Sequence, residues 1–259
     1  LTFVLVAQLA ALLLFVFNAD RLSVMFVGAM CAVGTLNVNG WGFPSLITQM
    51  AVFFLAAMWL AINHVDTLAR DYPLVRIKYA LLLLLLPVLA SSFWLELQYF
   101  LGLKANVITS CCGSMFSEEA KTIAAEASGL EPEPALWLFY AGMVAAIATP
   151  LWHWRLGSRI SGFLTALTSG AGFVAAITGV LSFISLYIYE HPHHHCPFCI
   201  LKPEYDYQGY WLYIPLFIAT AAGLGASAIQ PFARTPSLAS ILPRVSSPLA
   251  SLSVCCYIL

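Results

Sequence analysis

A nine-residue segment, 191–199, carries an unusual density of groups that bind metals or exchange disulfides. It reads His-Pro-His-His-His-Cys-Pro-Phe-Cys, with four of the six histidines in the chain and a Cys-x-x-Cys pair, Cys196 and Cys199. Imidazole and thiolate are ligands that soft and borderline metal ions prefer, and paired thiols are also the groups that exchange disulfides. The chemistry of this segment therefore depends on the compartment it faces and on what lies beside it.

A second cysteine pair, Cys111-Cys112, lies in the polar segment 102–134. Neighbouring cysteines rarely close a disulfide with each other, because the ring is strained and Cα atoms about 5.5 Å apart are preferred. As thiolates, both can reach one soft ion. Cu(I) would use two or three sulfurs, with Met115 as a further donor, and zinc would prefer four nitrogen or sulfur ligands. We predict a copper site, with zinc as the second choice, whose candidate ligands are Cys111, Cys112, Cys196, Cys199, His193, His194 and His195.

The same four cysteines support a redox interpretation, in which Cys196/Cys199 and Cys111/Cys112 exchange electrons. The tetrapeptide Cys-Pro-Phe-Cys resembles the motif of glutaredoxins. The layout, with a CxxC near a helix end and a second pair in an outer loop, is similar to that of vitamin K epoxide reductases and bacterial disulfide-forming membrane proteins. This resemblance implies a membrane thiol–disulfide oxidoreductase linked to a quinone. Those families, however, have four or five membrane spans and separated loop cysteines.

A third interpretation assigns no chemistry to the cysteines. A disulfide such as Cys112 to Cys196 would then join two outer loops and stabilise them. The chain would be a non-catalytic subunit of a larger membrane complex, and its other partners would be membrane subunits.

The composition predicts an integral membrane protein whose environment is the lipid bilayer. Hydrophobic residues make up 61% of the chain and charged residues 9%, with a mean hydropathy of +0.87. Soluble domains carry about 25% charged residues. The net charge of −1 gives no argument for a nucleic-acid partner.

Continuous apolar runs, each near the ~20 residues that cross a bilayer, predict transmembrane helices. The fold class is therefore an all-α integral membrane protein with about seven transmembrane helices. We expect one helical domain over 1–230, with outer loops 102–134 and 190–209, and a Pro/Ser-rich cytoplasmic tail over 231–259. The predicted spans are 2–18, 22–38, 45–63, 79–101, 135–152, 162–189 and 210–230.

The loop charges sort by sign and predict the orientation. One side holds eight basic residues and three acids; the other holds three basic residues and eight acids. The positive-inside rule makes the first side cytoplasmic, the N-terminus external and the C-terminus internal. Both loop cysteine pairs then face the oxidising, extracytoplasmic side of a plasma (inner) membrane, where a metal carrier or a thiol protein would be the partner. The basic residues of the first side are Arg21, Arg70, Arg76, Lys78, Arg155, Arg159, Arg234 and Arg244.

Two further features of the apolar runs bear on function. Glu96 is the only acidic residue within a run, and an intramembrane carboxylate is costly enough to be a functional candidate. It would act as a ligand, relay a proton or reach the outer interface. Cys31 is expected to be a small buried hydrophobic side chain. If its span lines the same cavity, Met30 and Cys31 would instead form a sulfur step beneath the outer site. Small residues in 162–189 and 210–230 predict that these two helices pack closely.

Overall fold

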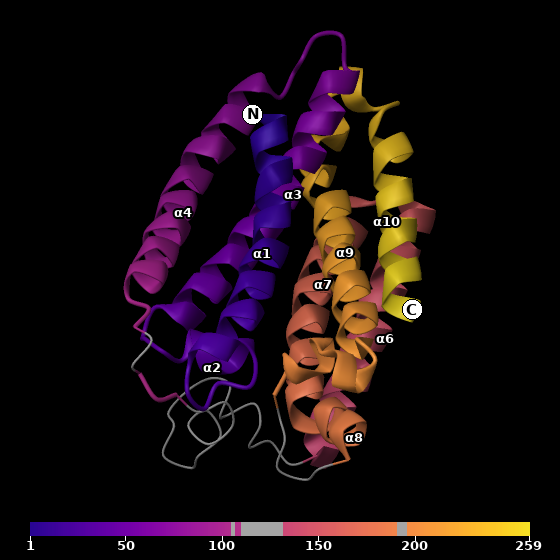
Figure 1. Cartoon of the computed structure of the whole chain (residues 1–259). Coiled ribbons are helices and arrows are strands. Elements are labelled where there is room, and N and C mark those ends of the chain that lie inside the picture. The colour runs from indigo at the N-terminus through magenta and orange to yellow at the C-terminus, as the bar shows by residue number, and fades with distance from the viewer. Residues whose placement is uncertain (105–106, 110–131, 191–195) are drawn as a thin grey trace.

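A computed structural model describes residues 1–104, 107–109, 132–190 and 196–259, and within them every regular element is a helix (Figure 1). The all-α prediction is confirmed for this part of the chain. The long helices are α1 (Thr2–Leu22), α3 (Gly42–Leu68), α4 (Val75–Leu101), α6 (Pro132–Leu156), α7 (Arg159–Gly179), α9 (Gln208–Ala228) and α10 (Leu242–Ile258). The short helices are η1 (Ser23–Met25), α2 (Ala32–Leu36), η2 (Val180–Ile184), α8 (Ser185–Tyr189), η3 (Cys199–Leu201), η4 (Pro203–Tyr205), η5 (Gln230–Arg234) and η6 (Pro236–Leu238).

Six stretches of helix in the described residues are long and apolar enough to cross a membrane. By the length and composition of these helices, the chain is an integral membrane protein. The six are Thr2–Met25, Gly42–Leu68, Val75–Leu101, Glu133–Leu156, Arg159–Tyr189 and Gln208–Phe232.

The predicted span over 22–38 is wrong. The backbone is instead extended at Phe26 and at Cys31, and it takes a positive φ of 87° at Gly28. The segment between α1 and α3 is therefore a loop that carries η1 and α2 at one end of the bundle (Figure 1).

Because this loop does not cross the bundle, the two ends of the molecule differ from the expected assignment. Thr2 accepts a hydrogen bond from Asn63 at 3.2 Å, so the chain starts at the end that holds the turn between α3 and α4. Asp20 lies 3.7 Å from Lys202, so Asp20 and the 190–209 loop share the opposite end. The predictions that the N-terminus lies opposite the basic loops, and that Asp20 lies beside them, are both wrong.

Two names are useful for these ends. Residues of the α3–α4 turn pack in one cluster with the segment that follows α9, through Ala69, Leu74, Ile229 and Leu238. We call this the basic end, since it carries Arg70, Arg76, Lys78, Arg155, Arg159, Arg234 and Arg244. The other is the cysteine end, which carries Cys31, Cys196 and Cys199.

The long helices form two groups joined by α3. Helices α6, α7, α9 and α10 pack against one another, α1 and α4 pack against α3, and α3 also contacts α9 (Figure 1). Phe53 and Phe54 of α3, Phe173 of α7 and Phe217 of α9 form an aromatic cluster at this junction, with ring centroids 5.0–5.5 Å apart.

The predicted close packing of the last two expected spans is confirmed. A Cβ atom on Gly223 of α9 would lie 2.2 Å from the hydroxyl oxygen of Ser169 in α7, a distance that only glycine permits. Beyond α9, residues 242–258 form α10, which runs alongside α6 and α9; Tyr257 near its end hydrogen-bonds Thr220 of α9.

Candidate metal centre

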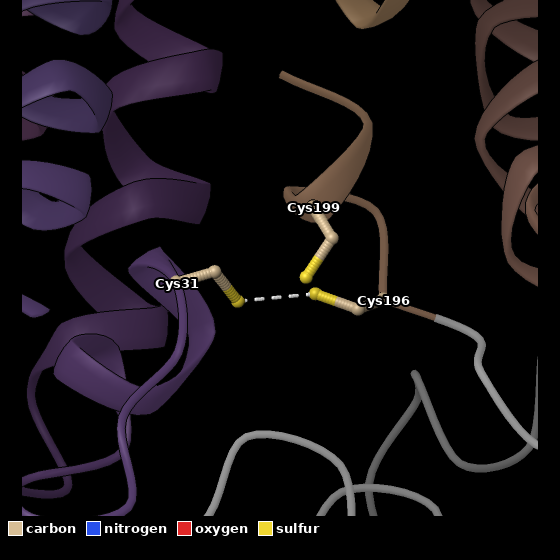
Figure 2. A group of neighbouring side chains, drawn as sticks. All are labelled: Cys31, Cys196 and Cys199. Atoms are coloured by element: carbon tan, nitrogen blue, oxygen red, sulfur yellow. Dashed lines mark hydrogen bonds between the residues drawn. The ribbon is translucent and has the colours of Figure 1, made fainter. Parts of the chain in front are cut away.

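Three cysteines from two distant parts of the chain meet at the cysteine end. The Sγ atoms of Cys31, Cys196 and Cys199 all lie within 4.8 Å of one another. The Sγ atoms of Cys31 and Cys196 are 3.2 Å apart, a thiol–thiol hydrogen bond and not a covalent bond (Figure 2). Cys31 precedes α2, whereas Cys196 lies in the turn that leads into η3 and Cys199 is the first residue of η3.

The site is enclosed by apolar side chains. Cys31 and Cys196 are 0% exposed and Cys199 is 6% exposed. Val33, Val180, Tyr189 and Ile200 complete the cluster around the three sulfurs. A charged thiolate here would be poorly solvated, so the site favours neutral thiols or a compensating positive charge.

The turn that holds Cys196 and Cys199 is fixed by tyrosines at its two supporting helices. The Tyr189 hydroxyl, at the end of α8, donates to the carbonyl oxygen of Cys196. The Tyr213 hydroxyl, on α9, donates to the carbonyl oxygen of Pro197 at 2.7 Å. Proline at 197 also fixes its own φ, so the turn presents both thiols in a defined geometry.

The segment that carries Cys31 is held by contacts with Thr109. The Thr109 amide donates to the carbonyl of Val27 at 3.0 Å, and its hydroxyl donates to the carbonyl of Gly34 at 2.8 Å. The backbone of Gly28 passes so close that a Cβ there would lie 2.0 Å from the Thr109 carbonyl oxygen. These contacts fix both flanks of Cys31 and orient its thiol toward the other two.

The electrostatics of the site keep Cys196 protonated. The hydrogen bond with Cys199 raises the pKa of the Cys196 thiol most; the bond with Cys31 lowers it and burial raises it again. The net result is a pKa well above the ordinary value of a cysteine. A thiol with so high a pKa is neutral at physiological pH, and a metal ion would have to displace its proton to bind.

The sequence-based prediction located two of these three residues. Cys196 and Cys199 do lie together in a site that can hold a metal ion. Cys31 was expected to be a plain hydrophobic side chain, because its run was interpreted as a span; the glycine at position 28 was the available signal of a break in that run. Of the two residues in the alternative of a sulfur step, Cys31 reaches the site, and Met30 beside it is 72% exposed. Cys111, Cys112, His193, His194 and His195 lie outside the described residues.

Three close sulfurs can hold one soft ion in a plane, or exchange a disulfide bond among themselves.

No protein-family model matches the sequence, and no curated protein or solved structure matches it either.

Proposed function

We propose that this protein binds a soft metal ion of the Cu(I) class at Cys31, Cys196 and Cys199, for delivery or transport at the membrane. The observation that carries the proposal is the mutual approach of three buried sulfurs within 4.8 Å. All-sulfur sites with few ligands suit Cu(I) better than harder ions.

The spacing of the sulfurs fits a three-coordinate ion. With metal–sulfur bonds of ~2.3 Å, three ligands around a planar ion lie about 4.0 Å from one another. The 3.2 Å separation of the Cys31 and Cys196 sulfurs would have to widen by less than one ångström, and the others already lie within 4.8 Å. Side-chain rotation alone can supply that change.

The number of ligands favours copper over zinc. Structural zinc sites use four ligands, whereas the described residues bring three sulfurs together. A fourth ligand from His193, His194, His195, Cys111 or Cys112 would favour zinc, and the same residues would serve as capture groups if the ion is copper.

The charge distribution supports an orientation for this function. Seven of the eleven basic residues lie at the basic end, so we place that end in the cytoplasm and the cysteine end outside. The partner would then be an extracytoplasmic metal carrier or thiol protein, and the membrane would be a plasma (inner) membrane.

The 3.2 Å contact between Cys31 and Cys196 favours a second candidate, thiol–disulfide exchange. The Cys31 thiolate would attack Sγ of a Cys196–Cys199 disulfide, forming a Cys31–Cys196 bond and releasing Cys199 as the thiolate. A quinone or a thiol protein would supply or remove the electron pair. The raised pKa of Cys196 counts against any exchange step in which the Cys196 thiolate itself must attack or leave, because the thiolate is the reactive form.

The decisive experiment replaces Cys31, the residue that only the folded chain brings to the site. Protein purified under reducing, anaerobic conditions is titrated with Cu(I) against a chromogenic chelator. We expect one Cu(I) per chain in the wild type. Loss of a residue that only hydrogen-bonds a metal ligand typically costs about 10–100-fold in metal affinity. Cys31 would be a ligand itself, so Cys31→Ser should cost at least ~100-fold.

The chain offers a matched control and a test of the composite site. Cys255→Ser/Cys256→Ser removes two thiols of α10 away from the cluster and should leave Cu(I) affinity unchanged. Cys111→Ser/Cys112→Ser reports whether the loop pair contributes ligands. Unchanged affinity in Cys31→Ser would overturn the proposal, and a Cys31–Cys196 disulfide that a quinone regenerates would establish the redox alternative.

A further inference from the structure

A second polar site lies between α3 and α4, apart from the Lys78–Asp66 ion pair that joins the same two helices at the basic end. Glu96 is on α4, within the span Val75–Leu101, and its side chain is half-buried. Among the residues that the structure describes, no lysine, arginine or histidine forms an ion pair with it. A carboxylate at this depth without a counter-ion is costly, so its charge needs compensation.

Gln49 of α3 is the direct partner of Glu96 and is itself incompletely satisfied. Its Nε2 donates to Oε2 of Glu96 at 2.9 Å. The side chain is 2% exposed, and its Oε1 is buried with no hydrogen-bond partner. Because Nε2 is used by Glu96, Oε1 of Gln49 remains beside the carboxylate as an acceptor without a hydrogen-bond donor.

Two serines extend the same polar interface by one helical turn on each side. Ser45 lies four residues before Gln49 on α3, and Ser92 lies four residues before Glu96 on α4, so each shares a helix face with its partner. Both serines are buried, at 0% and 2% exposure, and both hydroxyl oxygens are without a partner. Helical side chains lean toward the N-terminus, which carries the Glu96 carboxyl toward Ser92.

We propose that Glu96 and Gln49, with Ser92, bind a monovalent cation of the sodium class within the α3–α4 interface. All the donors are oxygens, which suit hard cations, and no sulfur or imidazole takes part. One carboxylate balances one positive charge, so a monovalent ion leaves the site neutral in the membrane. A proton would also neutralise Glu96, but it would supply only one hydrogen bond. Three buried oxygens lack a partner here: Gln49 Oε1, Ser45 Oγ and Ser92 Oγ.

This site is separate from the cysteine centre in chemistry but shares an element with it. Phe43 of α3 packs against the cluster that contains the three cysteines and against the cluster that contains Tyr99 of α4. A monovalent ion bound on α3 would give the protein access to an ion gradient. The proposal stands on the Glu96–Gln49 geometry alone and does not require that the cysteines bind copper.

Carbodiimide labelling tests the site with a direct chemical readout. Dicyclohexylcarbodiimide adds the O–H of a membrane-embedded carboxyl group across its C=N bond, and the adduct rearranges to a stable N-acylurea without a leaving group. Purified protein is labelled in choline chloride or in sodium chloride at equal ionic strength, and Glu96 is identified by mass spectrometry. We expect labelling in choline chloride and at least about a tenfold slower rate in sodium chloride.

Three variants separate cation binding from simple exposure of the carboxyl group. Glu96→Gln should abolish the label, and Gln49→Leu should keep the label but lose protection by sodium. Gln98→Leu, two residues along α4 from Glu96, should behave as wild type. A rise in the thermal unfolding midpoint with sodium, absent in Gln49→Leu, is the second readout. No label on Glu96, or a rate that depends on pH but is equal in sodium and choline, would overturn the proposal.

Discussion

At the scale of single residues, the cysteine centre depends on hydrogen bonds to the backbone of its turn as much as on its sulfurs. The carbonyl of Pro197 accepts from Tyr213, and the carbonyl of Cys196 accepts from Tyr189. A buried carbonyl that loses its donor costs about 1–3 kcal/mol. Both tyrosines bond to the backbone of the turn, so they act on the position of the thiols.

Tyr213→Phe isolates one of these contacts while keeping the ring. We expect a lower thermal unfolding midpoint in detergent and a Cu(I) affinity about tenfold weaker, within the ~10–100-fold range for outer partners of a metal ligand. Tyr210→Phe, on an exposed face of the same helix, is the control and should change neither quantity. Equal affinity in both variants would show that the turn holds its shape without the Tyr213 hydroxyl.

The raised pKa of Cys196 predicts the direction of the pH dependence of metal binding. Below that pKa the thiol is protonated, so an incoming ion must displace the proton. Affinity therefore increases as pH rises, by about tenfold per pH unit for each proton released. Competition titrations between pH 6 and 8 measure this slope, and an affinity that stays flat over the range would mean that the thiols are already ionised.

How far the sequence predicts the site depends on which residue is considered. Cys196 and Cys199 are recognisable because their spacing and neighbours are unusual in any context. Cys31 lies 165 residues from Cys196 in an apolar run. A single cysteine in such a run is indistinguishable by sequence from an ordinary buried hydrophobic residue. Its role depends on a tertiary contact between two loops, which neither hydropathy nor motif spacing encodes.

At the scale of elements, the loop between α1 and α3 shows where hydropathy misleads. The apolar residues of its second half pack against the bundle end, where Ala32, Val33 and Leu36 are buried, whereas Val24 and Val27 in its first half are exposed. The sequence-based interpretation took the same apolarity as contact with lipid and added a span. The other six runs were predicted correctly as helices, because no break of this kind interrupts them, and the structure extends them to 24–31 residues.

Gly28→Ala tests whether the conformation of this loop sets the position of Cys31. Gly28 has φ +87°, and an added Cβ would lie 2.0 Å from the Thr109 carbonyl oxygen. Strain of this kind costs about 1–3 kcal/mol, and the backbone clash must move the loop as well. We expect a lower unfolding midpoint together with weaker Cu(I) binding.

Gly40→Ala is the matched control for that substitution, since Gly40 lies in the same loop with open space around its Cβ position. It should leave both the unfolding midpoint and Cu(I) binding unchanged. If Gly28→Ala lowered stability but kept wild-type affinity, Cys31 would be positioned by α2 and not by the turn before it.

At the scale of the whole molecule, one extra predicted span assigns the residues that precede it to the wrong end of the bundle. With 22–38 counted as a crossing, the N-terminus falls opposite the basic loops; without it, α1 begins beside them, as the Thr2–Asn63 contact shows. Arg21 moves with Asp20 to the cysteine end, but the other seven basic residues of the predicted cytoplasmic side stay at the end opposite Cys196 and Cys199. The charge argument for orientation therefore survives the change in helix count.

An epitope-accessibility experiment tests this orientation without touching either site. One tag is inserted after Gly157, in the exposed turn between α6 and α7 at the basic end, where no atom lies within 4 Å of the Cβ position. A second is inserted after Glu204, an exposed residue at the cysteine end. Because Lys and Arg concentrate on the cytoplasmic side, the first tag should be reached by protease only in inverted vesicles and the second only in right-side-out vesicles. The opposite pattern would place the cysteine centre in the reducing cytoplasm, where a buried trio of thiols would receive Cu(I) from an internal carrier.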